Sequence, residues 1–282
     1  MFYFISIACM EEQKKDAKKL RTKKILVAED VEMNQYLARE ILEARGAEVS
    51  IASNGYEALE LLEKGFFDCI LMDVQMPEMD GIETTLRIRK LTDPKKSTVP
   101  IIAVTANVLN EDIRRYKAAG MNDYLAKPFD EPALLNVISR NENKDSGPWP
   151  SPKTLQHDEN LINTDTMQGT GKLYDLTMIQ SVSGGDEEFI KKMIALFIET
   201  VPNNIREMSE AAGQQDWDLA GKLAHKLKST IDSMGIKSVR DDIRKIESLC
   251  KEKKQLEEVP ALVTRVDHVI VACMEQLRAG LA

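Results

Sequence analysis

The first half of the chain alternates short apolar runs with segments of helical periodicity. The apolar runs, at residues 25–28, 49–52, 69–72, 101–104 and 124–126, read as strands. Between them, apolar residues recur at a spacing of three and four positions, and Gly46 and Gly65 follow two of these predicted helices. Strands that alternate with helices predict a doubly wound α/β domain with a parallel sheet, which we place at residues 24–140.

The second half of the chain shows helical periodicity and no strand pattern. Residues 141–171 are rich in Asn, Ser, Gly and Pro, which predicts a flexible linker. Four predicted helices follow, at residues 186–212, 216–233, 236–251 and 259–277, with Asp186 and Asp216 as expected N-caps. Short connections between them predict an all-α, up-down helical bundle in a second domain at residues 172–282.

Composition narrows the range of partners and compartments. The 282 residues carry a formal net charge of −8, which argues against a nucleic-acid partner. Four cysteines show no paired spacing, so neither a zinc site nor a disulfide framework is predicted, and a cytoplasmic location fits best. The N-terminal segment, residues 1–23, opens with an apolar run too short to span a bilayer, so we expect no membrane contact.

Polar residues stand where the predicted strands end. Glu29 and Asp30 follow the first strand, Asp73 the third, Thr105 the fourth and Lys127 the fifth. The carboxyl ends of parallel strands share one edge of a sheet, so these side chains are expected to converge. Clustered carboxylates repel one another unless a cation joins them, and hard oxygen ligands suit Mg²⁺.

This cluster predicts phosphoryl chemistry. We expect Asp73 to be a nucleophile that forms an acyl phosphate, Lys127 to supply positive charge and the Thr105 hydroxyl to donate a hydrogen bond. Each residue alone is better explained as a surface charge or a cap, and only the whole set favours a site. Asp68 and Asp123 stand at strand starts, on the opposite rim, and are expected to be ordinary solvated carboxylates.

Four motifs in this half closely resemble the receiver domains of response regulators and hybrid histidine kinases: ILVAED at 25–30, LMDVQMP at 71–77, TAN at 105–107 and KPF at 127–129. The resemblance implies a flavodoxin-like (βα)5 fold with Asp73 as the phosphoacceptor. It further implies metal ligation by Glu29, Asp30, Asp73 and the backbone carbonyl of Gln75, phosphate contacts from Thr105 and Lys127, and a switch aromatic at Tyr124. A cis Lys127–Pro128 bond is usual in that family.

One histidine in the second half is a candidate phosphoacceptor. His225 lies mid-helix, nearly opposite an apolar stripe that begins at Leu219, so it is expected to face solvent. Gly221 and Ser229 lie one turn on either side and are expected to let a partner approach, while Lys228 offers charge to a phosphoryl oxygen. The sequence AHKLKST at 224–230 with MG at 234–235 resembles histidine phosphotransfer domains, although glycine is commonest in that family where Ser229 stands.

Together the two resemblances imply a two-component phosphorelay protein, similar to the C-terminal part of a hybrid sensor histidine kinase. Its receiver would take a phosphoryl group from a sensor histidine kinase with Mg²⁺, and His225 would exchange it with a receiver aspartate, its own or a partner's. No ATP-binding kinase domain is recognisable, so any kinase activity is expected to belong to upstream domains. Two alternatives are a docking module without phosphotransfer and a haloacid dehalogenase-like phosphatase. Such phosphatases have a second Asp two residues after the nucleophile, and this chain has Gln75 at that position.

Overall fold

The computed structural model describes residues 20–106, 109–142 and 171–281. Contacts divide the chain into two compact units, one up to residue 155 and one from residue 156. The predicted segments 1–23 and 141–171 therefore fall mostly outside the described residues, as do Cys9, Asn107 and His157. The domain boundaries that we placed at residues 24, 140 and 172 stay predictions.

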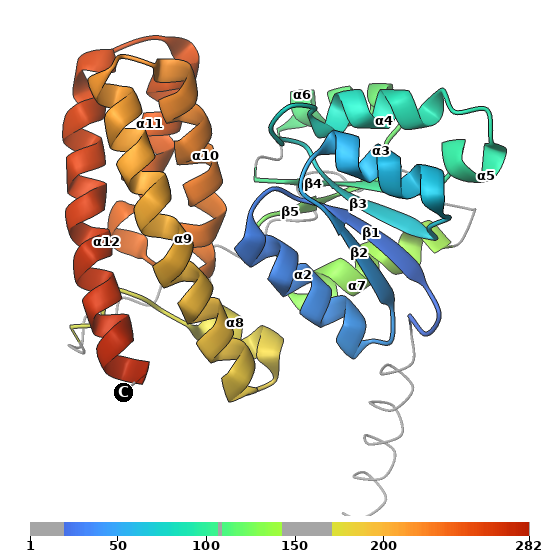
Figure 1. Ribbon diagram of the computed structural model, residues 1–282, viewed down its shortest axis with the longest axis horizontal. Coiled ribbons are helices and arrows are strands. Elements are labelled where there is room, and N and C mark those ends of the chain that lie inside the picture. The colour runs from blue at the N-terminus through green and yellow to red at the C-terminus, as the bar shows by residue number, and fades with distance from the viewer. Residues whose placement is uncertain (1–19, 107–108, 143–170, 282) are drawn as a thin grey trace, which may run out of the picture. The chain divides into compact units, whose positions relative to one another are not determined.

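The first unit is a five-stranded parallel sheet with helices on both faces (Figure 1). Its strands are β1 (Lys24–Ala28), β2 (Glu48–Ala52), β3 (Cys69–Asp73), β4 (Ile101–Thr105) and β5 (Asp123–Ala126). They lie in the order β2-β1-β3-β4-β5, so the direction of progress along the sheet reverses between β1 and β3. All five predicted strands are confirmed, each to within one residue at either end.

The helices of this unit are α2 (Glu32–Ala44), α3 (Gly55–Lys64), α4 (Gly81–Arg89), α5 (Pro94–Ser97), α6 (Asn110–Ala119) and α7 (Glu131–Glu142). In Figure 1, α2 and α7 lie on one face of the sheet and α3, α4 and α6 on the other. Strands β3 and β4 are buried along their whole length, which explains why they read as continuous apolar runs.

The second unit is a bundle of four long helices preceded by a short one (Figure 1). Its helices are α8 (Thr177–Ser183), α9 (Glu187–Gly213), α10 (Trp217–Ser233), α11 (Arg240–Glu252) and α12 (Val259–Leu281). The Asp186 and Asp216 side chains cap α9 and α10, as predicted. The short helix α8 was not predicted. The third predicted helix, at residues 236–251, begins as a 3₁₀ turn, Lys237–Val239, before α11.

Candidate functional site

Three carboxylates meet at the carboxyl ends of the two strands where the strand order reverses. Glu29 and Asp30 directly follow β1, and Asp73 is the last residue of β3. One carboxylate oxygen from each lies within 4.8 Å of the others. In open α/β sheets this crevice is where ligands bind.

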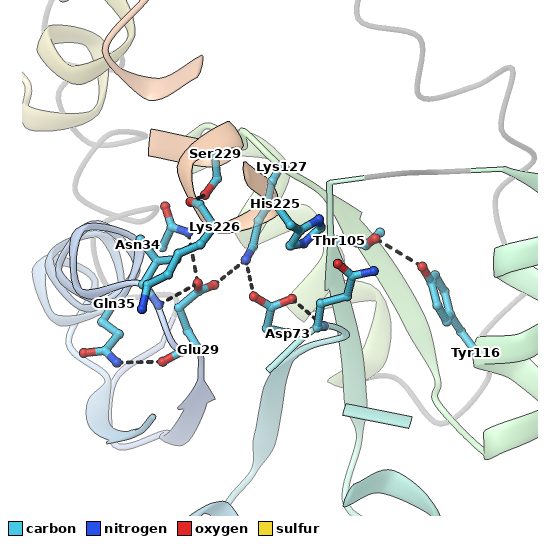
Figure 2. A network of polar contacts seen from close by, with 12 residues as sticks. Glu29, Asn34, Gln35, Asp73, Thr105, Tyr116, Lys127, His225, Lys226 and Ser229 are labelled. Atoms are coloured by element: carbon cyan, nitrogen blue, oxygen red, sulfur yellow. Dashed lines mark hydrogen bonds and ion pairs between the residues drawn. The ribbon is translucent and has the colours of Figure 1, made fainter. Parts of the chain in front are cut away.

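A single buried lysine joins two of these carboxylates (Figure 2). The Lys127 Nζ lies 2.5 Å from the Asp73 Oδ2 and 2.5 Å from the Glu29 Oε2. It comes from the loop after β5, and the Lys127–Pro128 bond is cis, as the family resemblance implied. The other Asp73 oxygen, Oδ1, accepts a hydrogen bond of 3.0 Å from the backbone N–H of Gln75.

The charges in this cluster do not cancel. Burial is the main cause that raises the pKa of Asp73, and Glu29 adds to it. Although Lys127 and the Gln75 N–H oppose both, the pKa is raised to about 8. Burial alone would lower the pKa of Lys127, but Asp73 and Glu29 together raise it above its ordinary value. Three carboxylates against one lysine leave excess negative charge, and such a set of hard oxygen donors fits a divalent cation such as Mg²⁺.

Two residues that we did not predict from the sequence fix the position of Glu29. The Asn34 Nδ2 donates to the Glu29 Oε1 over 2.9 Å, and the Gln35 Nε2 donates to the Glu29 backbone carbonyl over 2.6 Å. Both come from the first turns of α2, whose start carries no side-chain cap. The spacing of five and six residues from Glu29 across a strand-to-helix turn was the available signal.

Thr105 and Tyr124 lie in the neighbouring strands. Thr105 ends β4, and its hydroxyl lies 3.1 Å from the hydroxyl of Tyr116 in α6. Tyr124, the predicted switch aromatic, is only 1% exposed in β5. Burial raises the pKa of both tyrosines. Tyr116 had no role in our sequence analysis because nothing in the local sequence of α6 indicates which strand its side chain meets.

The prediction that Asp123 is an ordinary solvated carboxylate was wrong. Its side chain is buried at the start of β5 and accepts hydrogen bonds from Arg140 and Asn141 near the end of α7. A carboxylate at a strand start is therefore satisfied by the last turn of the next helix instead of by water. Asp68, by contrast, is exposed, and its carboxylate accepts from the backbone N–H of Lys24.

The candidate histidine of the second unit belongs to a three-residue network. The His225 Nδ1 in α10 lies 2.5 Å from the Glu247 Oε1 in α11, and the Lys228 Nζ lies 2.6 Å from the other Glu247 oxygen. Burial raises the pKa of Glu247, but hydrogen bonds from His225 and Lys228 outweigh it and lower the pKa to about 2. We did not predict a role for Glu247, because only the packing of α10 against α11 brings Glu247 close to His225.

His225 does not face open solvent as expected. Its side chain is 21% exposed, and its Nδ1 contacts Glu247 in α11. Ser229 is buried, and Leu219, which we assigned to the buried stripe, is 42% exposed. A Cβ on Gly221 would lie 2.9 Å from the Cβ of Cys250, so the small residue permits close packing of α11 instead of approach by a partner.

Family comparisons agree with both halves of this description. Residues 25–139 match the response regulator receiver domain, and residues 192–280 match the Hpt domain. The chain carries a receiver domain followed by an Hpt domain. Asp73 and its neighbours thus lie in the receiver domain, and His225, Lys228 and Glu247 lie in the Hpt domain.

The matches to curated relatives cover between half and most of this chain. The aerobic respiration control sensor protein ArcB of Escherichia coli (strain K12) is 30% identical over 225 residues, which cover 79% of this chain and 27% of that protein. The sensor histidine kinase GacS of Pseudomonas protegens is 26% identical over 254 residues, 89% of this chain and 26% of that one. Hybrid signal transduction histidine kinase I of Dictyostelium discoideum is 37% identical over 145 residues, 50% of this chain and 8% of that one.

The chain spans about a quarter of the length of the two bacterial sensor proteins, and less of the third. Its receiver and Hpt domains, together with these relatives, make it a phosphorelay signalling protein. In the part of the chain that the structure describes, no helix is both long and apolar enough to cross a bilayer.

Proposed function

We propose that Asp73 accepts a phosphoryl group from the phosphohistidine of a sensor histidine kinase. The buried Asp73 carboxylate beside Lys127 at the reversal of strand order carries this proposal. An Asp73 oxygen attacks phosphorus, the phosphorus–nitrogen bond of the donor breaks, and the imidazole leaves with a proton. The product on Asp73 is an acyl phosphate, whose added negative charge Lys127 offsets.

The same proposal assigns a Mg²⁺ ion to the receiver. Glu29, Asp30, Asp73 and the backbone carbonyl of Gln75 would hold it, and its charge would offset that of the carboxylates and of the phosphoryl group. Burial raises the pKa of Asp73 and so disfavours its ionised form, which is the form that can act as a nucleophile, and a nearby cation would favour that form. Thr105 would donate its hydroxyl to a phosphoryl oxygen, and Tyr124 would respond as the switch aromatic.

In the Hpt domain we assign the reacting nitrogen of His225 to Nε2. The Glu247 carboxylate accepts a hydrogen bond and so holds the ring proton on Nδ1, which leaves the lone pair on Nε2. This nitrogen would attack the phosphorus of an acyl phosphate on a receiver aspartate and release the carboxylate. Lys228 already neutralises Glu247, and its contact with a phosphoryl oxygen stays a prediction.

The partners follow from this chemistry: a sensor histidine kinase as donor and a receiver domain as acceptor for His225. A cytoplasmic compartment is part of the proposal, and the free, buried thiols of Cys69, Cys250 and Cys273 are consistent with reducing surroundings. The phosphatase alternative lacks its second aspartate, because Gln75 stands there and offers its backbone N–H to Asp73.

The test is to label the chain from a radioactive phosphohistidine donor with Mg²⁺ and to compare Asp73→Asn with His225→Gln. We expect base-labile label that Asp73→Asn abolishes and acid-labile label that His225→Gln abolishes. Asp68→Asn and His268→Gln are matched controls, because both residues are exposed and lie outside the two sites. If neither residue takes label from several donors, the chain is a docking module.

A further inference from the structure

A tyrosine of the receiver domain holds a residue of the predicted phosphate site. Tyr116 projects from α6 into the core, where it is 3% exposed, and its hydroxyl lies 3.1 Å from that of Thr105, which is 6% exposed. Figure 2 shows the Thr105 hydroxyl turned toward Tyr116. Both groups are shielded from water, so the hydrogen bond has no competition from solvent.

We propose that Tyr116 holds Thr105 in the resting receiver and loses this hydrogen bond when Asp73 is phosphorylated. The inference rests on the proposed function, in which the Thr105 hydroxyl turns to a phosphoryl oxygen on Asp73. A threonine side chain changes direction by moving between staggered rotamers, so contact with the phosphoryl group withdraws the hydroxyl from Tyr116. The tyrosine hydroxyl is then left buried without this partner, which opposes the active state.

Loss of the hydrogen bond between Tyr116 and Thr105 would also affect residues outside the phosphate site. Tyr116 and Tyr124, the predicted switch aromatic, belong to one cluster of buried side chains together with Met121 and Ala103. A tyrosine that seeks a new partner for its hydroxyl must move within this packed cluster or move α6 with it. Tyr116 is therefore a positioning residue that links the occupancy of the Asp73 site to α6.

The decisive variant is Tyr116→Phe, which keeps the ring and removes only the hydroxyl. Beryllofluoride with Mg²⁺ serves as the phosphoryl probe, and its dissociation constant for the full chain is measured by titration calorimetry. In wild type, binding of beryllofluoride must break the hydrogen bond between Tyr116 and Thr105, whereas in Tyr116→Phe there is no such bond to break. We therefore expect beryllofluoride to bind Tyr116→Phe about threefold to tenfold more tightly than wild type. Tyr56→Phe is the matched control, since Tyr56 is half-exposed and lies on α3.

A double-mutant cycle separates this effect from a general change in stability. In a Thr105→Ala background the hydroxyl that Tyr116 holds is gone, so Tyr116→Phe is expected to leave the affinity for beryllofluoride unchanged. Equal affinities of Tyr116→Phe and wild type would overturn the proposal, as would weaker binding by Tyr116→Phe, which would make Tyr116 a support of the active state. If wild type itself fails to bind beryllofluoride, the proposed function of Asp73 fails first.

Discussion

The two proposed phosphoacceptor sites differ in how their charges balance. At the receiver site, three carboxylates lie close together, Lys127 joins two of them, and the pKa of Asp73 is raised to about 8. At the Hpt site, the single carboxylate of Glu247 is paired with His225 and Lys228, and its pKa is lowered to about 2. The first site gathers three carboxylates, two of them buried, around one lysine that joins two of them, whereas at the second site one carboxylate has two partners.

This difference follows from the acceptor that each site presents. A carboxylate must stay ionised to attack phosphorus, and burial beside other carboxylates opposes ionisation. The Mg²⁺ ion that we propose for the receiver would favour the ionised form. An imidazole attacks as a neutral ring and needs only one nitrogen free of its proton. One hydrogen bond from Nδ1 to Glu247 meets that need without a metal.

The largest effect is expected when the receiver loses Lys127, the lysine that joins Asp73 and Glu29. Lys127→Gln leaves Asp73 and Glu29 without the ammonium group that joins them, and this group is the one expected to offset charge on the incoming phosphoryl group. We expect the rate of phosphoryl transfer to Asp73 to fall about 100-fold, as when a single charge-stabilising donor is removed from an active site. The measurement is the time course of labelling from a phosphohistidine donor.

Lys64→Gln provides the control for this experiment. Lys64 pairs with Glu60 over 2.5 Å on the surface of α3, where both side chains are largely exposed. Its removal is expected to leave the rate unchanged, because exposed pairs contribute little. A Lys127→Gln rate close to that of Lys64→Gln would mean that Lys127 only balances charge in the resting site.

At the Hpt site, removal of Glu247 takes away the carboxylate that pairs with both His225 and Lys228. Glu247→Ala leaves the Lys228 ammonium, which is 9% exposed, without this partner and frees His225 to rotate. We expect the free energy of unfolding of the Hpt domain to fall by about 2 kcal/mol. Urea unfolding monitored by the fluorescence of Trp217 in α10 measures this change, with Glu252→Ala on the exposed face of α11 as control.

The pH dependence of stability sharpens the same comparison. The pKa of Glu247 is about 2 in the folded domain against an ordinary value of 4.5, so between these values the unfolded state binds more protons. The stabilisation that Glu247 contributes is therefore complete above pH 4.5 and is lost as the pH falls toward 2. A Glu247→Gln variant is expected to lose stability less steeply in this window, and parallel curves would contradict the assignment.

The sequence predicted the receiver site better than the Hpt site, for a physical reason. Glu29, Asp30, Asp73 and Lys127 all stand at strand ends, and parallel strands bring their ends to one edge whatever the details of packing. The prediction for Asp123 was wrong because the position of a residue at the start of a strand does not show which helix covers that end of the sheet. Its partners Arg140 and Asn141 lie 17 and 18 residues away in the chain.

The Hpt site depends on how two helices are rotated and spaced, which the helical pattern of one of them does not reveal. The periodicity of α10 correctly placed Leu223, Ala224 and Leu227 in the core. It could not show that α11 lies close enough at Gly221 and Cys250 to bring Glu247 onto His225. His225 is therefore less exposed than we expected, because its Nδ1 contacts Glu247.

The smallest expected effect is a gain in stability when Mg²⁺ binds, and it distinguishes the receiver domain from the Hpt domain. Mg²⁺ at about ten times its dissociation constant stabilises a domain that binds it by about 1.4 kcal/mol. We expect this gain in the receiver domain alone, because Glu29, Asp30 and Asp73 offer clustered oxygens whereas Glu247 is already paired. Amide hydrogen exchange can measure it for each domain within the intact chain, by comparing β1 and β3 with α10 and α11.

Asp30→Asn and Asp68→Asn complete the comparison. Each replaces one carboxylate near an end of the sheet, but only Asp30 belongs to the cluster, so only Asp30→Asn is expected to abolish the slower exchange in β1 and β3 with Mg²⁺. Equal slowing in α10 and α11 would show that Mg²⁺ acts on the whole chain, through general charge screening. Slowing that survives Asp30→Asn would move the ion away from these carboxylates, and the excess negative charge at Asp73 would then need another counter-charge.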